Sequence, residues 1–272
     1  MAWTTEAEAL PEVSPSLAPN EAVALLFESY GDMIYSLGLS LCGEREGAED
    51  LVQETFLRAL KSWDGFEGRS KASTWLYTIA TRACRRMRRR RAGEPTRLES
   101  LTRLLPSGEE GLIQIPAEDD PEAEAVLRHA TDAIRSAVAK LPLDFKLPFV
   151  LKEMVGFTLA EVGEVLGLKE ATVKTRVHRA RLKVRQQLIE KLPSAPAPAK
   201  DHARQECMAL LRAKLEAMDR DAVFPLSLDV LCARCTSVFA TLDFARGACV
   251  MLREESMSDD LRSSLAEACG SA

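Results

Sequence analysis

The sequence predicts an all-α chain built from helical domains that are joined by linkers. Apolar residues recur three and four positions apart over long stretches, which places them on one face of a helix. Only 6% of the 272 residues are aromatic, whereas 46% are hydrophobic, which is enough for a core in each of two or three domains. Clusters of proline, glycine and acidic residues separate the helical stretches.

The first helical domain is expected at residues 20–91. It follows a flexible tail at residues 1–19, which contains prolines and serines but no helical periodicity. One helix should end at Gly43 and a second before Gly65. A third should run into residues 82–91, where seven of ten residues are arginine. These three helices are predicted to form one bundle.

Two further domains follow, each after a linker. Residues 92–120 are rich in proline, glycine and acidic residues and are expected to form an extended acidic linker. Helical periodicity resumes at residue 121 and predicts a compact helical domain over residues 121–192. Residues 193–200 should be a stiff connector, because repeated prolines remove backbone donors and favour extended geometry. Residues 201–272 then form a small cysteine-containing helical extension.

The charged residues are gathered in separate segments, although the formal net charge is only −5. Between residues 169 and 191, eight lysines and arginines stand against two glutamates, a net charge of +6. A local field of this kind decides whether a segment attracts nucleic acid, whatever the average charge of the chain. The composition is therefore compatible with DNA binding.

Nothing in the sequence predicts a membrane protein. No apolar window approaches the length needed to span a bilayer, and the acidic N-terminus lacks the basic start of a signal peptide. We therefore expect a cytoplasmic protein without a membrane partner. The seven cysteines, an odd number in a chain without an export signal, are better explained as thiols or metal ligands than as disulfides.

A helix-turn-helix is predicted within the second domain. Residues 158–161, Thr-Leu-Ala-Glu, have the form of a capping box that starts one helix, and Gly167 permits the tight turn to the next. The second helix has an apolar stripe and basic groups in the other directions, which is typical of a recognition helix in a major groove. The stripe consists of Val173, Val177, Ala180 and Val184. The residues expected to contact DNA are Glu170, Thr172, Lys174, Thr175, Arg176, His178, Arg179, Arg181 and Arg185, the first ones nearest the bases and the later arginines on the backbone.

Several segments resemble one protein family. Residues 141–142, 156–162 and 171–181 look like region 4 of bacterial sigma factors, and residues 48–59 and 73–80 resemble region 2 of the same family. Because only these two regions are recognisable, the chain is similar to the compact extracytoplasmic-function (ECF) group of the sigma-70 superfamily. The resemblance covers about residues 20–191 and leaves the C-terminal extension unexplained.

The resemblance implies a function in transcription initiation and no enzymatic activity. Core RNA polymerase and promoter DNA would be the partners, with region 4 at the −35 element and region 2 at the −10 element, and a separate anti-sigma factor is a further candidate partner. The −10 element is contacted as a melted strand, which suits aromatic and cationic side chains. The −10 candidates are Lys71, Ser73, Thr74, Trp75, Arg82, Arg85 and Arg86. The polymerase-binding candidates are Glu49, Asp50, Gln53, Glu54 and Arg58.

The cysteines of the extension are candidates for a metal site. Cys232 and Cys235 form a Cys-x-x-Cys pair, and Cys207 upstream and Cys249 downstream complete four sulfur ligands, with His202 as an alternative fourth ligand. Initiation itself requires no cofactor, so zinc or another soft ion would serve regulation. Buried free cysteines in small helices are the competing interpretation.

The extension is also similar to the zinc-binding anti-sigma domains that restrain many ECF sigma factors. Those domains have a histidine four residues before their Cys-x-x-Cys motif, and this chain has Leu228 there. A short proline-rich tether would keep the extension at a high local concentration near the DNA-binding unit. The extension is therefore expected to regulate the rest of the chain in cis, in response to a metal ion or to oxidation.

Two other functions compete with a sigma factor. A helix-turn-helix repressor or activator would bind duplex operators without docking on polymerase, but it would have no use for a separate N-terminal bundle with a polymerase-docking pattern. A thiol redox enzyme could use a Cys-x-x-Cys pair, but no strand alternation or βαβ pattern surrounds the one found here.

Overall fold

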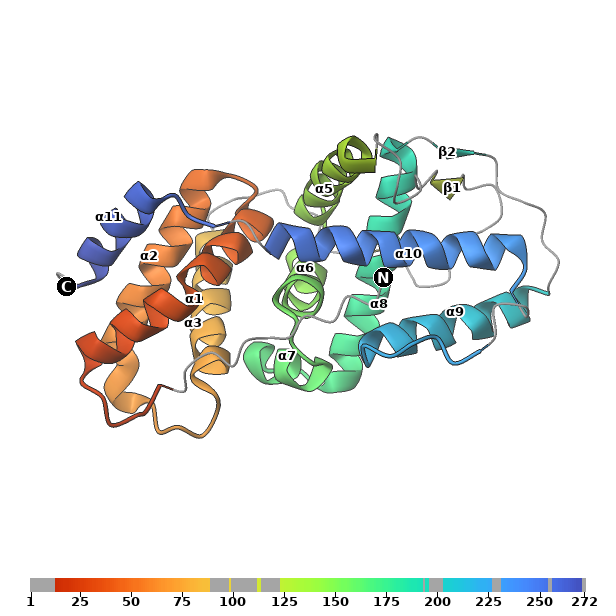
Figure 1. The fold of residues 1–272 in the computed structure, drawn as a ribbon. Helices are drawn as coiled ribbons and strands as arrows, with labels where there is room; N and C mark the ends of the chain where they lie inside the picture. The colour runs from red at the N-terminus through yellow and green to blue at the C-terminus, as the bar shows by residue number, and fades with distance from the viewer. Residues whose placement is uncertain are drawn as a thin grey trace.

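The structure is a computed structural model, and its described part is helical, as predicted, apart from two strands of two residues each. Ten α-helices in this part are grouped into two lobes and a C-terminal module (Figure 1). The structure describes residues 13–88, 98, 112–113, 123–192, 194–195, 203–226, 231–253 and 256–270.

The first lobe is a bundle whose core lies between its three long helices. Its elements are α1 (Pro19–Cys42), α2 (Arg45–Ser62), the short 3₁₀ turn η1 (Trp63–Gly65) and α3 (Ala72–Arg88). Proline suits the first turn of α1, and Gly43 ends that helix in the left-handed conformation, as the sequence predicted. Each long helix contributes completely buried side chains to this core, for example Leu26, Phe56 and Leu76.

Part of the predicted tail is packed onto this lobe. Residues 1–12 lie outside the described residues, but Val13 is only 6% exposed and belongs to the hydrophobic core. The indole nitrogen of Trp63 donates a hydrogen bond to the carbonyl of Leu17 at 3.0 Å. Where the sequence predicted a flexible tail, the structure therefore shows Val13 and Leu17 in contact with the first lobe.

The second lobe contains the helix-turn-helix. Its elements are α5 (Ala123–Ala139), α6 (Leu143–Val150), the π-type turn η2 (Leu151–Val155), α7 (Leu159–Leu166) and α8 (Glu170–Lys191). Helix α8 packs against α5, α6 and α7, so it is supported along much of its length. The two lobes touch each other where α3 meets α7.

The C-terminal module is formed by α9 (Arg204–Asp219), α10 (Ala233–Arg253) and α11 (Asp259–Gly270). Figure 1 shows α10 crossing the molecule from the end next to α9 toward the first lobe, where α11 lies beside α2. Helix α10 contacts α5, η2 and α8 of the second lobe and α1 of the first. The module therefore reaches both lobes.

Helix α10 corrects one expectation about the membrane. Residues 233–252 are long and apolar enough, by length and composition, to cross a bilayer, although no such window was expected. In this structure 56% of that segment is buried within the protein, where it packs on the helices of both lobes. Its apolar character is thus accounted for by a central position in the fold.

The two strands join the two predicted linkers. Strand β1 (Leu112–Ile113) pairs antiparallel with β2 (Ser194–Ala195), with Leu112 opposite Ala195 and Ile113 opposite Ser194. Apart from Leu98 and these strand residues, both predicted linkers lie outside the described residues.

Candidate nucleic-acid interface

The start of α7 has the capping box that the sequence predicted. The Thr158 hydroxyl accepts a hydrogen bond from the backbone N–H of Glu161 at 3.2 Å, and the Glu161 carboxylate accepts one from the backbone N–H of Thr158 at 3.0 Å. Burial raises the pKa of Glu161, but the Thr158 amide and the ammonium of Lys71 outweigh it and lower that pKa below its usual value. The carboxylate therefore stays ionised and holds the helix start.

The turn between α7 and α8 depends on two glycines. Gly167 has φ +67°, the left-handed conformation that favours glycine. At Gly163 the chain returns so closely that a Cβ atom would lie 2.7 Å from the carbonyl oxygen of Leu168. These two positions set the angle at which α8 leaves α7.

The apolar stripe of α8 faces the core, as predicted. The side chains of Val173, Val177, Ala180 and Val184 are at most 1% exposed. They pack with the core of the second lobe. The polar side chains of α8 are therefore divided between the two sides of this stripe.

One side of α8 is in contact with α9. The ammonium of Lys174 lies 3.0 Å from a carboxylate oxygen of Glu216, and the Nε2 atom of His178 lies 2.7 Å from Oδ2 of Asp219. Further along, Nη1 of Arg181 donates to Oδ1 of Asp219 at 2.6 Å. Three predicted DNA contacts are thus engaged by two carboxylates of the C-terminal module.

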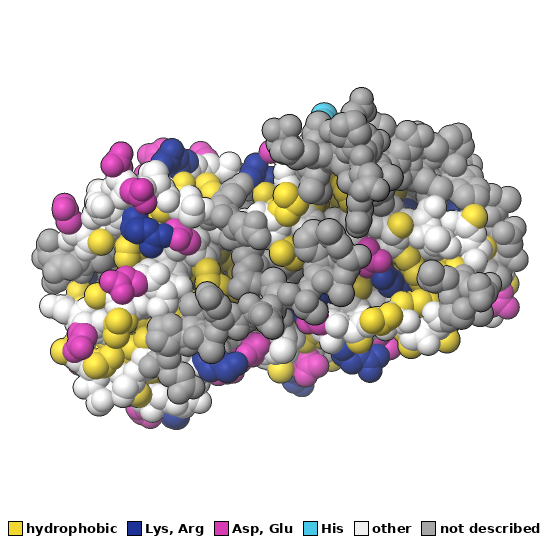
Figure 2. All heavy atoms as spheres, viewed as in Figure 1, with side chains coloured by type: hydrophobic (Ala, Val, Ile, Leu, Met, Phe, Trp, Pro, Cys, Tyr) yellow, Lys and Arg dark blue, Asp and Glu magenta, His cyan; other side chains and the backbone are white. Residues whose placement is uncertain are grey.

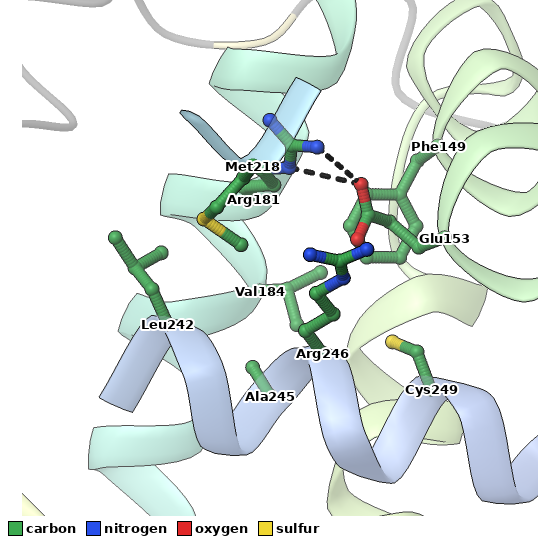
Figure 3. Close-up of a pocket in the computed structure, with 9 residues that line it drawn as sticks. All are labelled: Phe149, Glu153, Arg181, Val184, Met218, Leu242, Ala245, Arg246 and Cys249. Atoms are coloured by element: carbon green, nitrogen blue, oxygen red, sulfur yellow. Dashed lines mark hydrogen bonds and ion pairs between the residues drawn. The ribbon is translucent and has the colours of Figure 1, made fainter. Parts of the chain in front are cut away.

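Arg181 is buried between two carboxylates. Its Nη2 atom lies 2.6 Å from Oε1 of Glu153, and all three side chains of the Glu153–Arg181–Asp219 group are at most 5% exposed. Burial lowers the pKa of Arg181, but the two carboxylates outweigh it and raise that pKa. Burial raises the pKa of Asp219, but the hydrogen bond from His178 and the charge of Arg181 lower it overall. Figure 3 shows the guanidinium of Arg181 turned toward Glu153, with Arg246 and Cys249 of α10 nearby.

The other predicted −35 contacts differ in their exposure. Glu170 and Thr175 are exposed, and Thr172 is half-buried. Arg176 donates to the carbonyl of Asp144 at 3.2 Å, and Arg179 stacks over the ring of Phe145 and donates to the carbonyl of Leu98.

Two of the predicted DNA contacts are not available in this structure. Arg181 is 3% exposed and Arg185 is 1% exposed, so neither can reach a DNA backbone here. The sequence placed both on a solvated side of α8, but Leu215 and Asp219 of α9 engage Arg181 there and Arg185 is buried. The expected exposure of Arg181 and Arg185 is therefore wrong for this arrangement of the chain, in which neither can contact a DNA backbone.

The predicted −10 residues lie at and near the start of α3. Lys71 is exposed and forms an ion pair with Glu161 of α7 at 2.9 Å, and Ser73 is half-buried. Thr74 is only 3% exposed, and the ring of Trp75 packs against Trp63 and Phe66 with centroids 5.5 and 5.1 Å apart. The prediction that Thr74 contacts the single strand is therefore wrong for this structure, because its side chain is buried.

Three arginines of α3 were also predicted to contact the −10 strand. Arg82 and Arg86 are exposed, and Arg85 is half-buried. Arg86 approaches the carboxylate of Glu54 on α2 at 3.5 Å. The exposed cations therefore follow one side of α3 beyond its aromatic start.

The predicted polymerase-binding residues share the outer side of α2. Asp50, Gln53 and Arg58 are exposed, and Glu49 and Glu54 are half-buried. Among the described residues visible on the face in Figure 2, basic and acidic side chains are interspersed over the first lobe. The outer side of α2 itself carries acidic residues together with Arg58, which suits a protein partner of mixed charge better than a run of phosphates.

Three cysteines of the C-terminal module lie together. The sulfur atoms of Cys207 on α9 and of Cys232 and Cys235 at the start of α10 are all within 4.8 Å of one another. Burial, with the neighbouring thiols Cys232 and Cys207, raises the pKa of the Cys235 thiol to about 12. His202, the alternative fourth ligand, and Leu228 lie outside the described residues.

Cys249 is not part of this cluster, so its prediction as a fourth ligand is wrong. Cys235 and Cys249 lie on the same continuous helix, and fourteen residues separate them by about 21 Å along its axis. Cys249 instead lies near Glu153 and Arg181, where burial raises the pKa of its thiol.

Comparison with known proteins shows to which family the chain belongs. The sigma-70 region 2 family matches residues 26–94, and the sigma-70 region 4 family matches residues 131–184. The chain is 34% identical to the ECF RNA polymerase sigma factor SigW of Bacillus subtilis over 174 residues, which are 62% of this chain and 89% of SigW. The chain belongs to the ECF RNA polymerase sigma factors. Sigma factors of this kind bind core RNA polymerase and promoters and are not enzymes.

Two further comparisons illustrate the range of relatives. This sigma factor is 34% identical to SigE of Mycolicibacterium smegmatis over 168 residues, which are 61% of each chain. Among solved structures, the sigma factor RpoE of Bartonella quintana in complex with the anti-sigma factor NepR aligns over 57% of this chain and 89% of its own, with 25% identity and a TM-score of 0.41. The two regional matches end at residue 184, so α9, α10 and α11 lie beyond both.

Sequence reasoning missed the acidic partners of α8 in this sigma factor. Glu216 and Asp219 are three residues apart on α9, which places both on one side of that helix. Their spacing matches the spacing of Lys174, His178 and Arg181 on α8. This complementarity was visible in the sequence, but helical periodicity alone does not say which two helices meet.

Proposed function

We propose that this sigma factor directs core RNA polymerase to promoters through α8 at the −35 element and α3 at the −10 element. The observation that carries the proposal is the helix-turn-helix of residues 158–191, which lies within and just beyond the region 4 match. Its capping box, left-handed Gly167 and buried apolar stripe fix α8 as a firmly supported helix with cations on its free sides. Such a helix fits a major groove.

The residues of α8 divide into two roles in this proposal. Glu170, Thr172, Lys174, Thr175 and Arg176 lie in its first two turns and would contact base edges. Arg179 follows them and would contact phosphates, together with His178. Phosphate contacts set the affinity and the register, whereas base contacts set the sequence preference.

Region 2 supplies the other two interactions. The exposed cations Lys71, Arg82 and Arg86 would contact the backbone of the melted −10 strand. The outer side of α2, with Asp50, Gln53 and Arg58 exposed, would dock on core polymerase. Because polymerase and promoters are cytoplasmic, the sigma factor would act in the cytoplasm.

In vitro transcription with purified core polymerase over a promoter library tests this function. The unmodified chain should produce promoter-specific transcripts that core polymerase alone does not produce. Arg176→Ala should change the preferred −35 sequence, with a loss of discrimination of about 5- to 150-fold at one position, corresponding to ~1–3 kcal/mol. Arg135→Ala removes a half-buried arginine of α5, which lies outside the helix-turn-helix, and should leave the preference unchanged. Absence of association with core polymerase would overturn the proposal.

The three clustered cysteines support a metal site in the C-terminal module. Sulfur ligands at about 2.3 Å from a tetrahedral zinc ion are about 3.8 Å apart, so three thiols within 4.8 Å need only a small closing movement. Thiolates select soft or borderline ions such as zinc or Cu(I). Binding such an ion would release the thiol protons and stabilise the junction of α9 with α10.

Elemental analysis of the full chain purified under reducing conditions tests the metal site. We expect about one zinc or copper ion per chain, and its loss in Cys232→Ser with Cys235→Ser. Cys42→Ser, which changes a half-buried cysteine of the first lobe, should retain the ion. A metal-free chain, or a disulfide between these cysteines under the same conditions, would contradict a metal site.

A further inference from the structure

We infer that α9 occupies the DNA-binding side of α8, so that α9 and promoter DNA compete for the same side chains. This inference rests on the proposed role of α8 at the −35 element. It concerns Lys174, His178 and Arg181, which follow one another at spacings of four and three residues and therefore share one side of α8. All three are engaged by Glu216 or Asp219.

The contacts of α9 resemble those that a phosphate backbone would make. Carboxylate oxygens accept hydrogen bonds from lysine, histidine and arginine at 2.6 to 3.0 Å, as phosphate oxygens do. Glu216 and Asp219 repeat at helical spacing, so they present two negative groups in a row along the axis of α8. A strand of DNA on this side would have to replace both carboxylates.

The fit leaves no room for DNA beside α9. The side chains of His178, Arg181 and Asp219 are 11%, 3% and 5% exposed. Only the outermost pair, Lys174 with Glu216, is half-exposed, at 39% and 47%. Binding of DNA on this side therefore requires α9 to leave, whereas Glu170 and Thr175 stay accessible with α9 in place.

Apolar packing holds α9 in this position. Leu211, Leu215 and Met218 of α9 form a hydrophobic cluster with Leu182 of α8. The cluster is completed from α10 by Val238, Phe239 and Leu242. The carboxylates of α9 are thus set against α8 by a packed interface, and not by charge attraction alone.

The turn after α9 adds a second anchor. Asp221 has φ +53°, a left-handed conformation that is uncommon outside glycine. Its carboxylate pairs with Lys152 of η2 at 3.1 Å and with Arg246 of α10. One acidic residue thereby ties the end of α9 to the second lobe and to the rest of the module.

The far end of the module is fixed on the first lobe, which keeps α9 close to α8. The hydroxyl of Ser36 on α1 donates to the carbonyl of Leu252 at the end of α10, at 2.8 Å. Asp32 accepts from the backbone N–H of Met257 at 3.0 Å and pairs with Arg262 of α11. Attachment at this second place raises the effective concentration of α9 at α8.

Charge-removing variants of the full chain test the competition. Glu216→Gln with Asp219→Asn removes both carboxylates from the α8 interface and keeps the size of each side chain. Asp259→Asn with Asp260→Asn is the matched control, because it removes the same charge from exposed positions at the start of α11. The probe is a fluorescein-labelled 20-base-pair duplex of random sequence at low salt, since backbone binding needs no promoter.

The Glu216/Asp219 variant should bind this duplex at least tenfold more tightly than the control variant, with a steeper salt dependence because Lys174, His178 and Arg181 gain access to phosphates. Equal affinities of the two variants would overturn the inference. Thermal unfolding by circular dichroism checks the fold. If the double variant is unfolded, Glu216→Gln alone, at the half-exposed pair, should still bind about two- to threefold more tightly than wild type. An unchanged affinity of this single variant overturns the inference.

The same variants distinguish this inference from the proposed function. If the Glu216/Asp219 variant binds the duplex more tightly but yields no promoter-specific transcripts with core polymerase, α9 covers α8 but the sigma function fails. If wild type yields promoter-specific transcripts and both variants match it in duplex binding and transcription, the sigma function stands and the competition is wrong.

Discussion

Arg181 illustrates how a residue of the recognition helix becomes part of the core. Its guanidinium lies between Glu153 of the second lobe and Asp219 of the C-terminal module, and all three side chains are almost completely buried. A buried charge is tolerated only when its partners are in place, because ions are strongly destabilised away from water. This group therefore links the module to the second lobe, and the link is stable only while both carboxylates stay in contact with Arg181.

Removal of one carboxylate from this group should destabilise the protein. Glu153→Gln leaves Arg181 buried with a single charged partner, and we expect the free energy of unfolding to fall by about 3 kcal/mol. Asp132→Asn breaks the exposed pair with Arg135 on α5 and should cost less than about 1 kcal/mol. Urea unfolding followed by circular dichroism measures the free energy of unfolding of both variants. Equal losses would show that the buried group stabilises the protein no more than the exposed pair does.

Asp219 should make stability depend on acidity. Its pKa in the folded protein lies below the ordinary 3.8, because His178 and Arg181 outweigh the effect of burial. A depressed carboxyl pKa stabilises the fold above the ordinary pKa, and that stabilisation is lost as pH falls through the lower folded value. Between about pH 5 and pH 2.5, wild type should therefore lose more stability than Asp219→Asn. Parallel urea midpoints for the two proteins over this range would contradict the assignment.

At the scale of single residues, the sequence predicted the burial of those side chains whose position follows from helical periodicity alone. Val173, Val177, Ala180 and Val184 were placed in the core correctly because their spacing defines one side of α8. Arg181 and Arg185 were placed in solvent wrongly, and for Arg181 the reason is that its partners Glu153 and Asp219 come from distant parts of the chain. Cys249 was assigned to the metal site wrongly, because sequence order does not reveal that α10 is continuous from Cys235 onward.

Among the elements, the turn between α7 and α8 is the one on which the interface depends. Gly163 lies inside α7, where a glycine normally weakens a helix, and no sequence pattern predicted a role for it. Its reason is spatial, since a Cβ atom would meet the carbonyl oxygen of Leu168 at 2.7 Å. The capping box and Gly167 were predictable because their signals are local, whereas this close approach is visible only in three dimensions.

Gly163→Ala should therefore disturb the helix-turn-helix. We expect a lower melting temperature and a loss of promoter-specific transcription, because α8 must shift away from α7 to relieve the contact. Gly65→Ala is the matched control, since a Cβ atom there would meet no atom within 4 Å and Gly65 has no positive φ. Differential scanning calorimetry and the transcription assay measure the two effects. A Gly163→Ala protein that behaves like Gly65→Ala would show that the backbone adjusts freely.

At the scale of the whole molecule, the two helices that we propose to bind the promoter, α3 and α8, are too close together to contact both elements at once. Lys71, before α3, pairs with Glu161 of α7, and α7 is only eight residues, or about 12 Å, long. The −10 and −35 elements are about 25 base pairs apart, which is roughly 85 Å of duplex. The lobes must therefore separate on a promoter, and the contact of Tyr77 with Phe157 must be lost.

Hydrogen–deuterium exchange should detect this opening. Amides of α9 and of the interface between α3 and α7 should be protected in the free sigma factor and should exchange faster once core polymerase and a promoter are added. Amides in the middle of α5, which stay in the core of the second lobe, serve as the internal reference. Protection of α9 that is unchanged in an initiating complex would mean that DNA is bound with α9 still in place.

The arrangement of the lobes could be predicted only in part from the sequence. The order of two helical domains and a C-terminal module followed from periodicity and linker composition. How the module lies on both lobes did not, because α9 and α8 meet through side chains that are about 40 residues apart in the chain and have no shared local pattern. Contacts of this kind are set by the shape of whole surfaces.

The order of the helices along the chain has a consequence for newly made protein. Residues 13–192, which include both promoter-binding helices, leave the ribosome before residues 204–270, which form the module. At about 5–20 residues per second, synthesis of those last 67 residues takes roughly 3–13 s. For part of that interval α8 has left the ribosome and α9 has not, so under the proposed function each nascent chain briefly exposes α8 cations that α9 engages in the finished protein.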